Sequence, residues 1–125
     1  MATISRTRFV IAVPNLQESD NFYRDVLGFS VLTIPDPGWR FYTLGVCTIM
    51  AGGCRDAIAA HELGDHSYFA YLEVDDIDEY YASILASAGV ILKTIRNEPW
   101  GMREFGVATP HGHRIMFGAP VSATG

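Results

Sequence analysis

The sequence predicts an α+β protein built from two consecutive β-α-β-β-β modules. The segment that begins at Val13 recurs at Val74, an offset of 61 residues that also superimposes the chain's two tryptophans, Trp39 and Trp100. Duplication is the favoured explanation of this shared offset, and the alternative is coincidence combined with ordinary strand patterning. Each half also shows the same order of strand, helix and turn signals. Further pairs at this offset are Leu16 with Ile77, Glu18 with Glu79, Gly28 with Gly89, Gly45 with Gly106 and Val46 with Val107.

Each half begins with a strand signal and then a helix-start signal. β-branched and aromatic residues fill 9–13 and 68–74, which predicts a strand in each. Asn15 precedes Glu18 by three residues, and Asp76 precedes Glu79 by the same spacing. This is capping-box spacing, in which an Asn or Asp oxygen accepts an early helix N–H group. Helices are therefore predicted over 16–27 and 77–88.

Glycines and turn residues set the remaining elements. Gly28 and Gly89 follow the two helices and suit the C′ position, where a positive φ costs glycine little. Prolines and glycines at 35–38 and 110–112 predict turns. Three further strands are then expected in each half, at 29–33, 40–44 and 46–50, and at 90–94, 102–108 and 114–117.

Length and composition limit the class of protein. At 125 residues, with 49 % hydrophobic and 18 % charged residues, the chain is expected to fold as a single domain, 1–125. A module of this size buries little surface by itself, so the two modules are expected to pack together. We expect module one at about 5–51, a linker at about 52–66 with at most one helical turn, and module two at about 67–118.

The net charge and the cysteine content indicate which binding partners and which cellular compartment to expect. Nine basic and fourteen acidic residues give a net charge of −5, which disfavours nucleic acid and anionic membranes as partners. The apolar run 9–13 stops at Pro14, too short for a signal core or a spanning helix, so a cytoplasmic location is expected. Cys47 and Cys54 are expected to be reduced, and neither is expected to act as a nucleophile.

Several short motifs then suggest a family. They are Val13-Pro14-Asn15-Leu16 followed by Phe22-Tyr23 and Val26-Leu27-Gly28-Phe29, then Val74-Asp75-Asp76-Ile77, and Trp100-Gly101-Met102-Arg103-Glu104-Phe105 leading to Pro110-His111-Gly112-His113. In this order, with the duplication, the chain resembles the vicinal oxygen chelate superfamily over nearly its whole length. That superfamily includes glyoxalase I, extradiol dioxygenases, fosfomycin-resistance enzymes and bleomycin-resistance proteins. The resemblance implies a glyoxalase-like fold, in which curved sheets surround a cleft, and commonly a homodimer.

The resemblance also implies where a divalent metal would be bound. Metal-dependent members use four His, Glu or Gln ligands, two from each module, and the matching positions here are Arg8, Phe69, Met50 and Met116. Arginine repels a cation, phenylalanine donates nothing, and thioether sulfur suits soft ions. The chain therefore resembles the metal-free, bleomycin-resistance-like members most closely, and no metal or other cofactor is expected.

The four histidines are the alternative candidates for a metal site. His111 and His113 are two apart, a spacing that would place both rings on one face of a strand. They flank a Pro-x-Gly turn, so turn chemistry is the favoured interpretation. His61 and His66 lie in the linker and would act chemically only if that loop folded over the cleft.

Strand alternation extends the list of residues expected to line the cleft. If positions 8 and 69 face the cleft, Val10, Tyr71 and Glu73 share that face, and positions 50 and 116 add Thr48 and Arg114. Arg103 and Glu104 point to opposite faces, so one of them faces the cleft, and the sequence does not decide which. The expected ligand-binding residues are Arg8, Trp39, Thr48, Met50, Phe69, Tyr71, Glu73, Trp100, Arg103, Arg114 and Met116.

Two functions follow as hypotheses. The first is metal-independent binding, or sequestration, of a small, partly aromatic molecule, as in antibiotic-resistance proteins, with methionine adapting to an irregular ligand. The alternative is an enzyme, either metal-dependent with atypical ligands or metal-free with Glu73 or Glu104 as general base. The second form needs a carboxylate whose pKa is raised by an apolar cleft.

Overall fold

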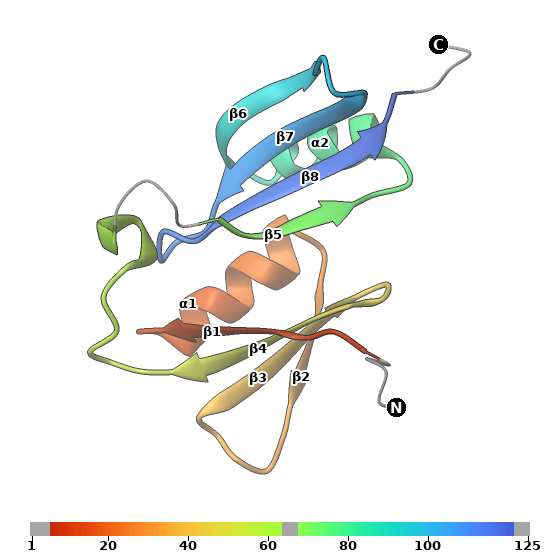
Figure 1. Ribbon diagram of the computed structural model, residues 1–125. Coiled ribbons are helices and arrows are strands. Elements are labelled where there is room, and N and C mark those ends of the chain that lie inside the picture. The colour runs from red at the N-terminus through yellow and green to blue at the C-terminus, as the bar shows by residue number, and fades with distance from the viewer. Residues whose placement is uncertain (1–5, 64–67, 122–125) are drawn as a thin grey trace, which may run out of the picture. The chain divides into compact units, whose positions relative to one another are not determined.

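A computed structural model of the protein describes residues 6–63 and 68–121. The chain divides into two compact units, Met1–Ala59 and Ala60–Gly125. Each unit contains one four-stranded mixed sheet and one principal helix (Figure 1). The order of elements is the same in both units, which confirms the predicted β-α-β-β-β repeat.

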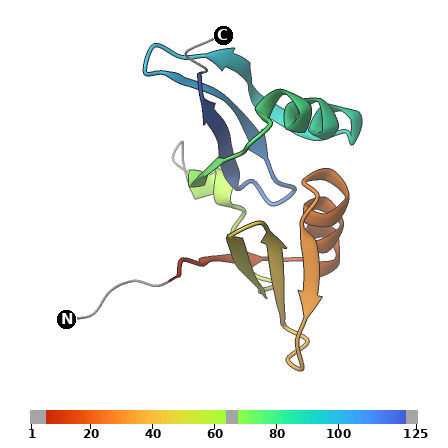
Figure 2. The same ribbon diagram turned by 90° about the vertical axis from the view of Figure 1, so that its right-hand side faces the viewer.

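The first unit builds its sheet in the order β1-β4-β3-β2. β1 runs parallel to β4, and the other neighbours are antiparallel. The helix that connects β1 to β2 lies on one face of this sheet (Figure 2). The elements are β1 (Phe9–Val13), α1 (Leu16–Asn21), a π-helical turn η1 (Phe22–Val26), β2 (Ser30–Thr33), β3 (Trp39–Leu44) and β4 (Cys47–Gly53).

The second unit repeats this topology with the order β5-β8-β7-β6 and a parallel β5·β8 pair. A short 3₁₀ helix, η2, precedes the sheet and supplies the single helical turn expected in the linker. The elements are η2 (Ala60–Leu63), β5 (Tyr68–Glu73), α2 (Ile77–Ala86), β6 (Val90–Asn97), β7 (Met102–Ala108) and β8 (Arg114–Pro120).

Both predicted helix starts are confirmed. The Asn15 side chain accepts a hydrogen bond from the Glu18 N–H group at 3.0 Å, and the Asp76 side chain accepts one from Glu79 at 3.4 Å. Each bond satisfies a backbone donor that a helix leaves without an internal partner. The two caps therefore fix where the chain turns from the first strand of each unit into its helix.

The helix ends differ from the prediction in two ways. The first helix changes to a π-helical turn at Phe22, where the N–H group of Leu27 bonds to the Phe22 carbonyl at 3.2 Å. Over a single turn, apolar spacing does not distinguish the π from the α period. In the second unit the positive φ falls on Ala88 at 61° and not on Gly89, whereas Gly28 has the expected positive φ of 80°.

Several strands are longer than predicted. β4 continues through Gly53, beyond the expected strand end at residue 50, because Gly52 pairs with Trp39 and Gly53 with Val13. β6 and β8 likewise extend to Asn97 and Pro120. These extensions depend on partners that are distant in sequence, so local residue preferences do not reveal them.

Aromatic side chains form the core between each helix and its sheet. In the first unit Tyr23 stacks on Tyr42, with ring centroids 4.5 Å apart. In the second unit Tyr81 from α2 meets Phe105 at 4.9 Å, and Phe105 in turn contacts Phe117 at 5.4 Å. All of these rings except Tyr81 are buried. They identify the face of each sheet that its own helix covers.

No helix in the described ranges is long and apolar enough to cross a membrane.

Candidate binding face

Each sheet has a second face, turned away from its own helix, which we call the open face. Successive side chains of a strand point to opposite faces. Tyr42 in β3 and Phe105 in β7 pack toward the helices, so their immediate neighbours in each strand belong to the open face. The register between strands then assigns the remaining residues.

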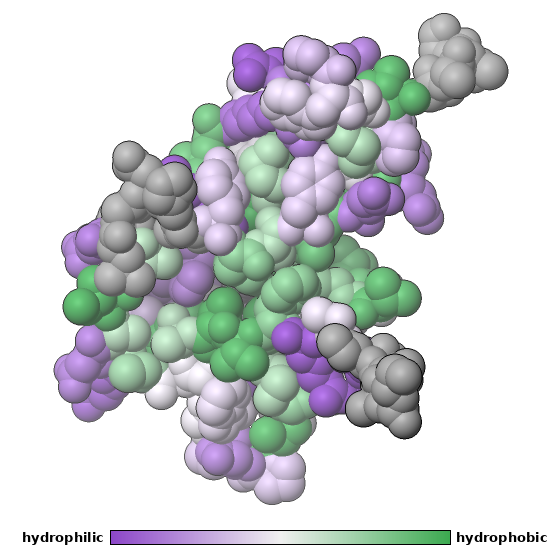
Figure 3. Space-filling model, in the orientation of Figure 1, coloured by the Kyte–Doolittle hydropathy of each residue, from purple (hydrophilic) through white to green (hydrophobic). Residues whose placement is uncertain are grey.

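The open face of the first unit carries an apolar row across all four strands. Leu32 pairs with Phe41, Phe41 with Met50, and Met50 with Val10. Leu32 and Val10 are 55 % and 65 % exposed. Hydrophobic residues gather over β1 and β4 of this unit (Figure 3). Met50 and Thr48, two of the expected ligand-binding residues, therefore lie on an apolar surface.

Trp39 covers a glycine on the same face. A Cβ atom added to Gly52 would lie 3.0 Å from Cη2 of the Trp39 indole ring and 3.2 Å from two further ring atoms. The ring is therefore seated against the backbone of β4, and only glycine leaves space for it. Trp39 is the first residue of β3, whereas Trp100 lies in the turn before β7 and is 64 % exposed.

The open face of the second unit is more polar. Tyr71 pairs with Met116, Met116 with Gly106, and Gly106 with Lys93. The row two residues further along contains Glu73, Gly118 and Glu104. Tyr71, Glu73, Met116 and Arg114 thus lie on one face, as strand alternation suggested.

Glu104 is the centre of a hydrogen-bonded cluster on this face. Only 3 % of the residue is exposed. Its Oε1 atom accepts hydrogen bonds from Lys93 Nζ at 3.0 Å and from Trp100 Nε1 at 3.1 Å, and the carboxylate is also bonded by the Tyr71 hydroxyl group. The structure therefore resolves the open question between Arg103 and Glu104: Glu104 lies on the open face.

These contacts keep Glu104 ionised. Burial by itself opposes the charge, but hydrogen bonds from Tyr71, Lys93 and Trp100 and the charge of Lys93 leave the pKa of Glu104 below its ordinary value. This direction is opposite to that required of the proposed general base. Desolvation and the neighbouring carboxylate raise the pKa of Tyr71, so its hydroxyl group stays protonated as a donor.

Lys93 joins this cluster to a second carboxylate. Its ammonium group lies 3.2 Å from Oε1 of Glu98 and 5.4 Å from the centroid of the Trp100 ring. Glu98 is also bound by Arg96. The hydrogen bonds from Arg96 and Lys93 hold the pKa of Glu98 below its usual value, although desolvation acts in the opposite direction.

Arg114 lies at the other end of the same face. Its guanidinium carbon is 5.7 Å from the centroid of the Tyr68 ring, a cation–π arrangement, and the two residues are partners across the β5·β8 pair. Tyr68, Tyr71 and Trp100 therefore supply aromatic surface near the cations Arg114 and Lys93.

The positions that correspond to metal ligands do not suit a divalent cation. Arg8 precedes β1 and is exposed, and Phe69 is the inserted residue of a β-bulge, with its ring 5.7 Å from that of His113. Met50 and Met116 offer thioether sulfur only. Within residues 6–63 and 68–121, no group of three or more His, Cys, Asp or Glu side chains is arranged to hold a metal ion.

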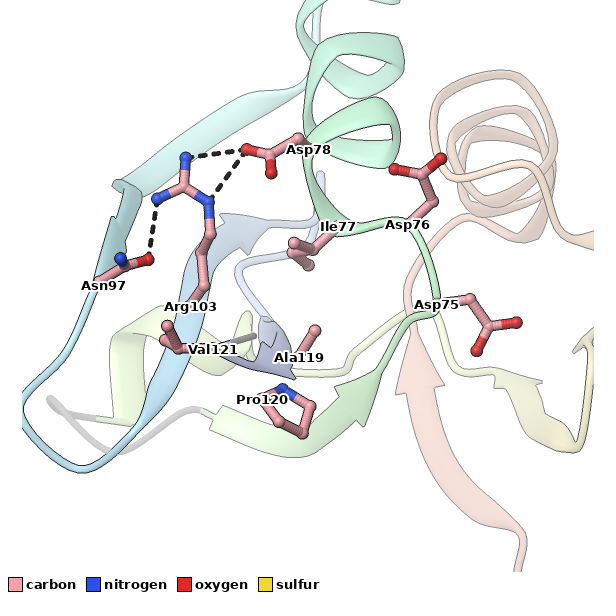
Figure 4. Close-up of a pocket in the computed structure, with 9 residues that line it drawn as sticks. All are labelled: Asp75, Asp76, Ile77, Asp78, Asn97, Arg103, Ala119, Pro120 and Val121. Atoms are coloured by element: carbon pink, nitrogen blue, oxygen red, sulfur yellow. Dashed lines mark hydrogen bonds and ion pairs between the residues drawn. The ribbon is translucent and has the colours of Figure 1, made fainter. Parts of the chain in front are cut away.

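Arg103 was expected to bind a ligand. It lies on the helix-covered face of its sheet and not on the open face. Its guanidinium group donates to Asp78 of α2 at 2.8 and 3.0 Å and to Asn97 at 3.0 Å. These residues border a hollow at the start of α2 (Figure 4). The ion pair joins β7 to α2.

The cluster includes neither His111 nor His113, and neither of the two cysteines. His111 and His113 belong to the turn after β7, which the Gly112 N–H group closes on the Thr109 carbonyl at 3.0 Å. His61 belongs to η2, and His66 falls outside the described residues. Cys47 and Cys54 are free thiols, and burial raises the pKa of Cys47, which makes it a poor nucleophile.

Sequence reasoning missed three residues that shape the open faces of the two units. They are Lys93, Phe41 and Gly118. Lys93 had a local signal, because a lysine within the apolar run 90–95 needs a charged partner if it faces a sheet interior. Phe41 and Gly118 had none, since their importance comes from partners in other strands.

Comparison with known proteins places this arrangement among related folds. The family model of the Glyoxalase/Bleomycin resistance protein/Dioxygenase superfamily matches residues 5–117. No curated protein matches the chain.

Solved structures with the same fold are numerous and divergent in sequence. TnmS3, an antibiotic binding protein from Streptomyces sp. CB03234, has a TM-score of 0.75 at 21 % identity, covering 96 % of this chain and 98 % of that one. TioX from Micromonospora sp. ML1 has a TM-score of 0.73 at 20 % identity, covering 92 % and 99 %. A putative glyoxalase family protein from Bacillus anthracis has a TM-score of 0.72 at 18 % identity, covering 96 % and 99 %. At these identities the likeness establishes a glyoxalase-like fold.

Proposed function

The chain belongs to the Glyoxalase/Bleomycin resistance protein/Dioxygenase superfamily, and we propose that it binds a small, partly aromatic molecule on its open sheet faces without a metal. The observation that carries the proposal is the composition of those faces. One presents the row Leu32, Phe41, Met50 and Val10, and the other presents Tyr68, Tyr71 and Met116. Small-molecule sites are typically apolar and aromatic, with few polar groups.

Methionine and aromatic side chains suit a ligand with flat apolar parts. Met50 and Met116 occupy equivalent places in β4 and β8, and the thioether side chain adapts to irregular surfaces. Tyrosine and tryptophan add large contact area with little loss of conformational entropy. The fold of TnmS3, an antibiotic binding protein, supports a ligand of this kind.

Metal independence is proposed from donor chemistry. Hard and borderline divalent cations need imidazole, carboxylate or amide oxygen ligands, and Arg8, Phe69, Met50 and Met116 supply none of these. The carboxylate of Glu104 is already engaged by Lys93, Trp100 and Tyr71.

The test combines metal analysis with ligand binding. Tag-free protein, purified without chelators, is analysed for metal content and titrated with a panel of planar aromatic antibiotics by tryptophan fluorescence, before and after EDTA treatment. We expect binding of at least one compound, with a Kd that EDTA does not change. Met50→Ala and Met116→Ala are expected to weaken binding. Val46→Ala, at a fully exposed position in a turn, is the matched control. Stoichiometric metal with chelator-sensitive binding would contradict the proposal.

The acid–base alternative now rests on Glu73, because Glu104 has a lowered pKa and three hydrogen-bond donors. Glu73 lies on the open face and is exposed. If the protein is an enzyme of this type, Glu73→Gln abolishes proton exchange from a bound carbon acid and leaves the Kd for that compound unchanged. An unchanged exchange rate in this variant eliminates the alternative.

We also propose a homodimer, as expected from the family resemblance. Native mass spectrometry of the intact protein should then show twice the 13.8 kDa chain mass. A monomer at micromolar concentration would contradict this proposal and leave the binding proposal unaffected.

A further inference from the structure

We infer that Tyr71 is a fixed aromatic platform that selects planar ligands carrying a positive charge, and that Gly118 and Glu104 are the residues that position it. This inference rests on the proposed function, because it specifies the chemistry of a ligand bound on the open face of the second unit.

Gly118 provides the seat for the ring. A Cβ atom added there would lie 2.0 Å from the Tyr71 hydroxyl oxygen, 2.7 Å from Cζ and 3.2 Å from Cε1. These distances show that the phenol ring lies across the backbone of β8, and that a larger residue at this position would displace the ring. Tyr71 is nevertheless 44 % exposed. One side of the ring is therefore held by the sheet while a large part of it stays accessible.

Glu104 fixes the far end of the ring. Its buried carboxylate accepts the Tyr71 hydroxyl hydrogen bond and is itself held by Lys93 at 3.0 Å and Trp100 at 3.1 Å. A side chain bonded at its tip and seated along its length loses little further entropy when a ligand stacks on it. Donation to a carboxylate also increases the negative charge of the phenol ring, which strengthens attraction of a cation to its face.

The charges around Tyr71 favour the same class of ligand. Glu73 and Tyr71 lie on the same face of β5, and Glu73 pairs with Gly118, the residue that the ring covers. The cations nearby are paired: Lys93 is shared between Glu98 and Glu104, and Arg96 binds Glu98. Arg114 lies over the Tyr68 ring. Because Lys93 offsets the charge of Glu104, the exposed carboxylate of Glu73 is the negative charge that a ligand on the accessible ring would meet.

The first unit repeats the seating arrangement. Gly52 follows Met50 by two residues in β4, as Gly118 follows Met116 in β8, and Gly52 is covered by the Trp39 ring. An aromatic ring from a different strand therefore covers the equivalent glycine in each unit. The ring comes from β3 in the first unit and from β5, the counterpart of β1, in the second.

The test uses three linear tricyclic probes that differ in charge. Proflavine is cationic at neutral pH, acridine is neutral and anthracene-2-carboxylate is anionic. Equilibrium dialysis against the full-length protein gives a Kd for each. We expect proflavine to bind about tenfold more tightly than anthracene-2-carboxylate, with acridine between them, a difference typical of a cation–π contact plus a nearby carboxylate.

Two groups of variants test the position of the Tyr71 ring and the charge of Glu73 separately. Gly118→Ala and Tyr71→Ala should each weaken proflavine binding about tenfold, because the first displaces the ring and the second removes it. Glu73→Gln should reduce the preference for proflavine over anthracene-2-carboxylate. The controls are Gly38→Ala, in a turn of the first unit, and Asp25→Asn, an exposed carboxylate of that unit.

The outcomes distinguish a failure of this inference from a failure of the proposed function. Equal affinity for all three probes, or unchanged proflavine binding in both Gly118→Ala and Tyr71→Ala, overturns this inference and leaves the proposed function intact. Failure of the wild-type protein to bind any tricycle overturns this inference, and if the antibiotic panel also fails, it overturns the proposed function as well. If Gly118→Ala does not fold, Tyr71→Ala, a truncation of a half-exposed side chain, still gives the decision.

Discussion

The ammonium nitrogen of Lys93 lies 3.0 Å from Oε1 of Glu104, and only 4 % of the Glu104 side chain is exposed. A buried carboxylate that loses its cation retains its desolvation cost without the compensating charge. Lys93→Met should therefore destabilise the protein by about 2 kcal/mol, measured by urea denaturation.

Lys93→Arg keeps the charge and is the matched control, with an expected loss of less than about 1 kcal/mol. If Lys93→Met were as stable as the wild type, the ion pair would contribute nothing to folding.

The lowered pKa of Glu104 predicts how stability depends on pH. Its pKa in the folded protein is below the ordinary value of 4.5, so the folded state favours the carboxylate. This contribution is complete above about pH 4.5 and is lost as the pH falls through the lower, folded-state pKa. Denaturation curves should show a steeper loss of stability on acidification in the wild type than in Glu104→Gln. If the free energy of unfolding depended on pH in the same way in both proteins, this contribution of Glu104 would be refuted.

Removing the hydroxyl group from Tyr23 or from Tyr42, both in the core of the first unit, should change the stability of the protein in opposite directions. The buried Tyr23 hydroxyl group has no hydrogen-bond partner among the described residues, whereas the Tyr42 hydroxyl group donates to Asp20 at 2.7 Å and lies 2.9 Å from Ser19 Oγ. Tyr23→Phe should raise the free energy of unfolding by about 1 kcal/mol, and Tyr42→Phe should lower it by about 1–2 kcal/mol. A loss of stability in Tyr23→Phe would show that its hydroxyl group is hydrogen-bonded in solution.

Ala88 holds a backbone conformation that favours glycine. Its φ is 61°, and it closes α2 with hydrogen bonds from Ala88 to Leu85 and from Gly89 to Ile84, at 3.2 and 2.9 Å. Ala88→Gly should stabilise the protein by about 1 kcal/mol by relieving this strain. Ala82→Gly, at an exposed position inside α2, should instead destabilise it by about 1 kcal/mol. Thermal unfolding tests whether Ala88→Gly raises the melting temperature and Ala82→Gly lowers it.

His113 gives a second pH dependence, nearer neutrality. Burial, and then the charge of His111, lower the pKa of His113 from 6.5, so the folded protein favours the neutral ring. Stability from this residue is complete above about pH 6.5 and decreases as the pH falls below it. His113→Gln should flatten the change in unfolding free energy between about pH 7.5 and about pH 5.5. His111→Gln in the same turn is the comparison, and an unchanged slope in His113→Gln would contradict the assignment.

The sequence by itself determined the repeat and most of its elements. Side-chain oxygens at Asn15 and Asp76 cap the helices through bonds that span three residues, so their effect is local and readable. Strand alternation placed Tyr71, Glu73 and Met116 on one face because its period of two residues is also local. Gly89 was the local exception, since one residue's difference in where α2 ends moves the positive φ to Ala88.

Which of these residues come together as a site depends on the tertiary fold. Lys93, Trp100 and Tyr71 converge on Glu104 from β6, the turn after it and β5, and Gly118 receives the Tyr71 ring from another strand. Strand register sets these contacts, and register depends on pairing between residues far apart in the chain. The same pairing extended β4 through Gly53 and turned Arg103 toward Asp78. Local residue preferences contain no information about such partners, so the fold was predictable while the chemistry of its open faces was not.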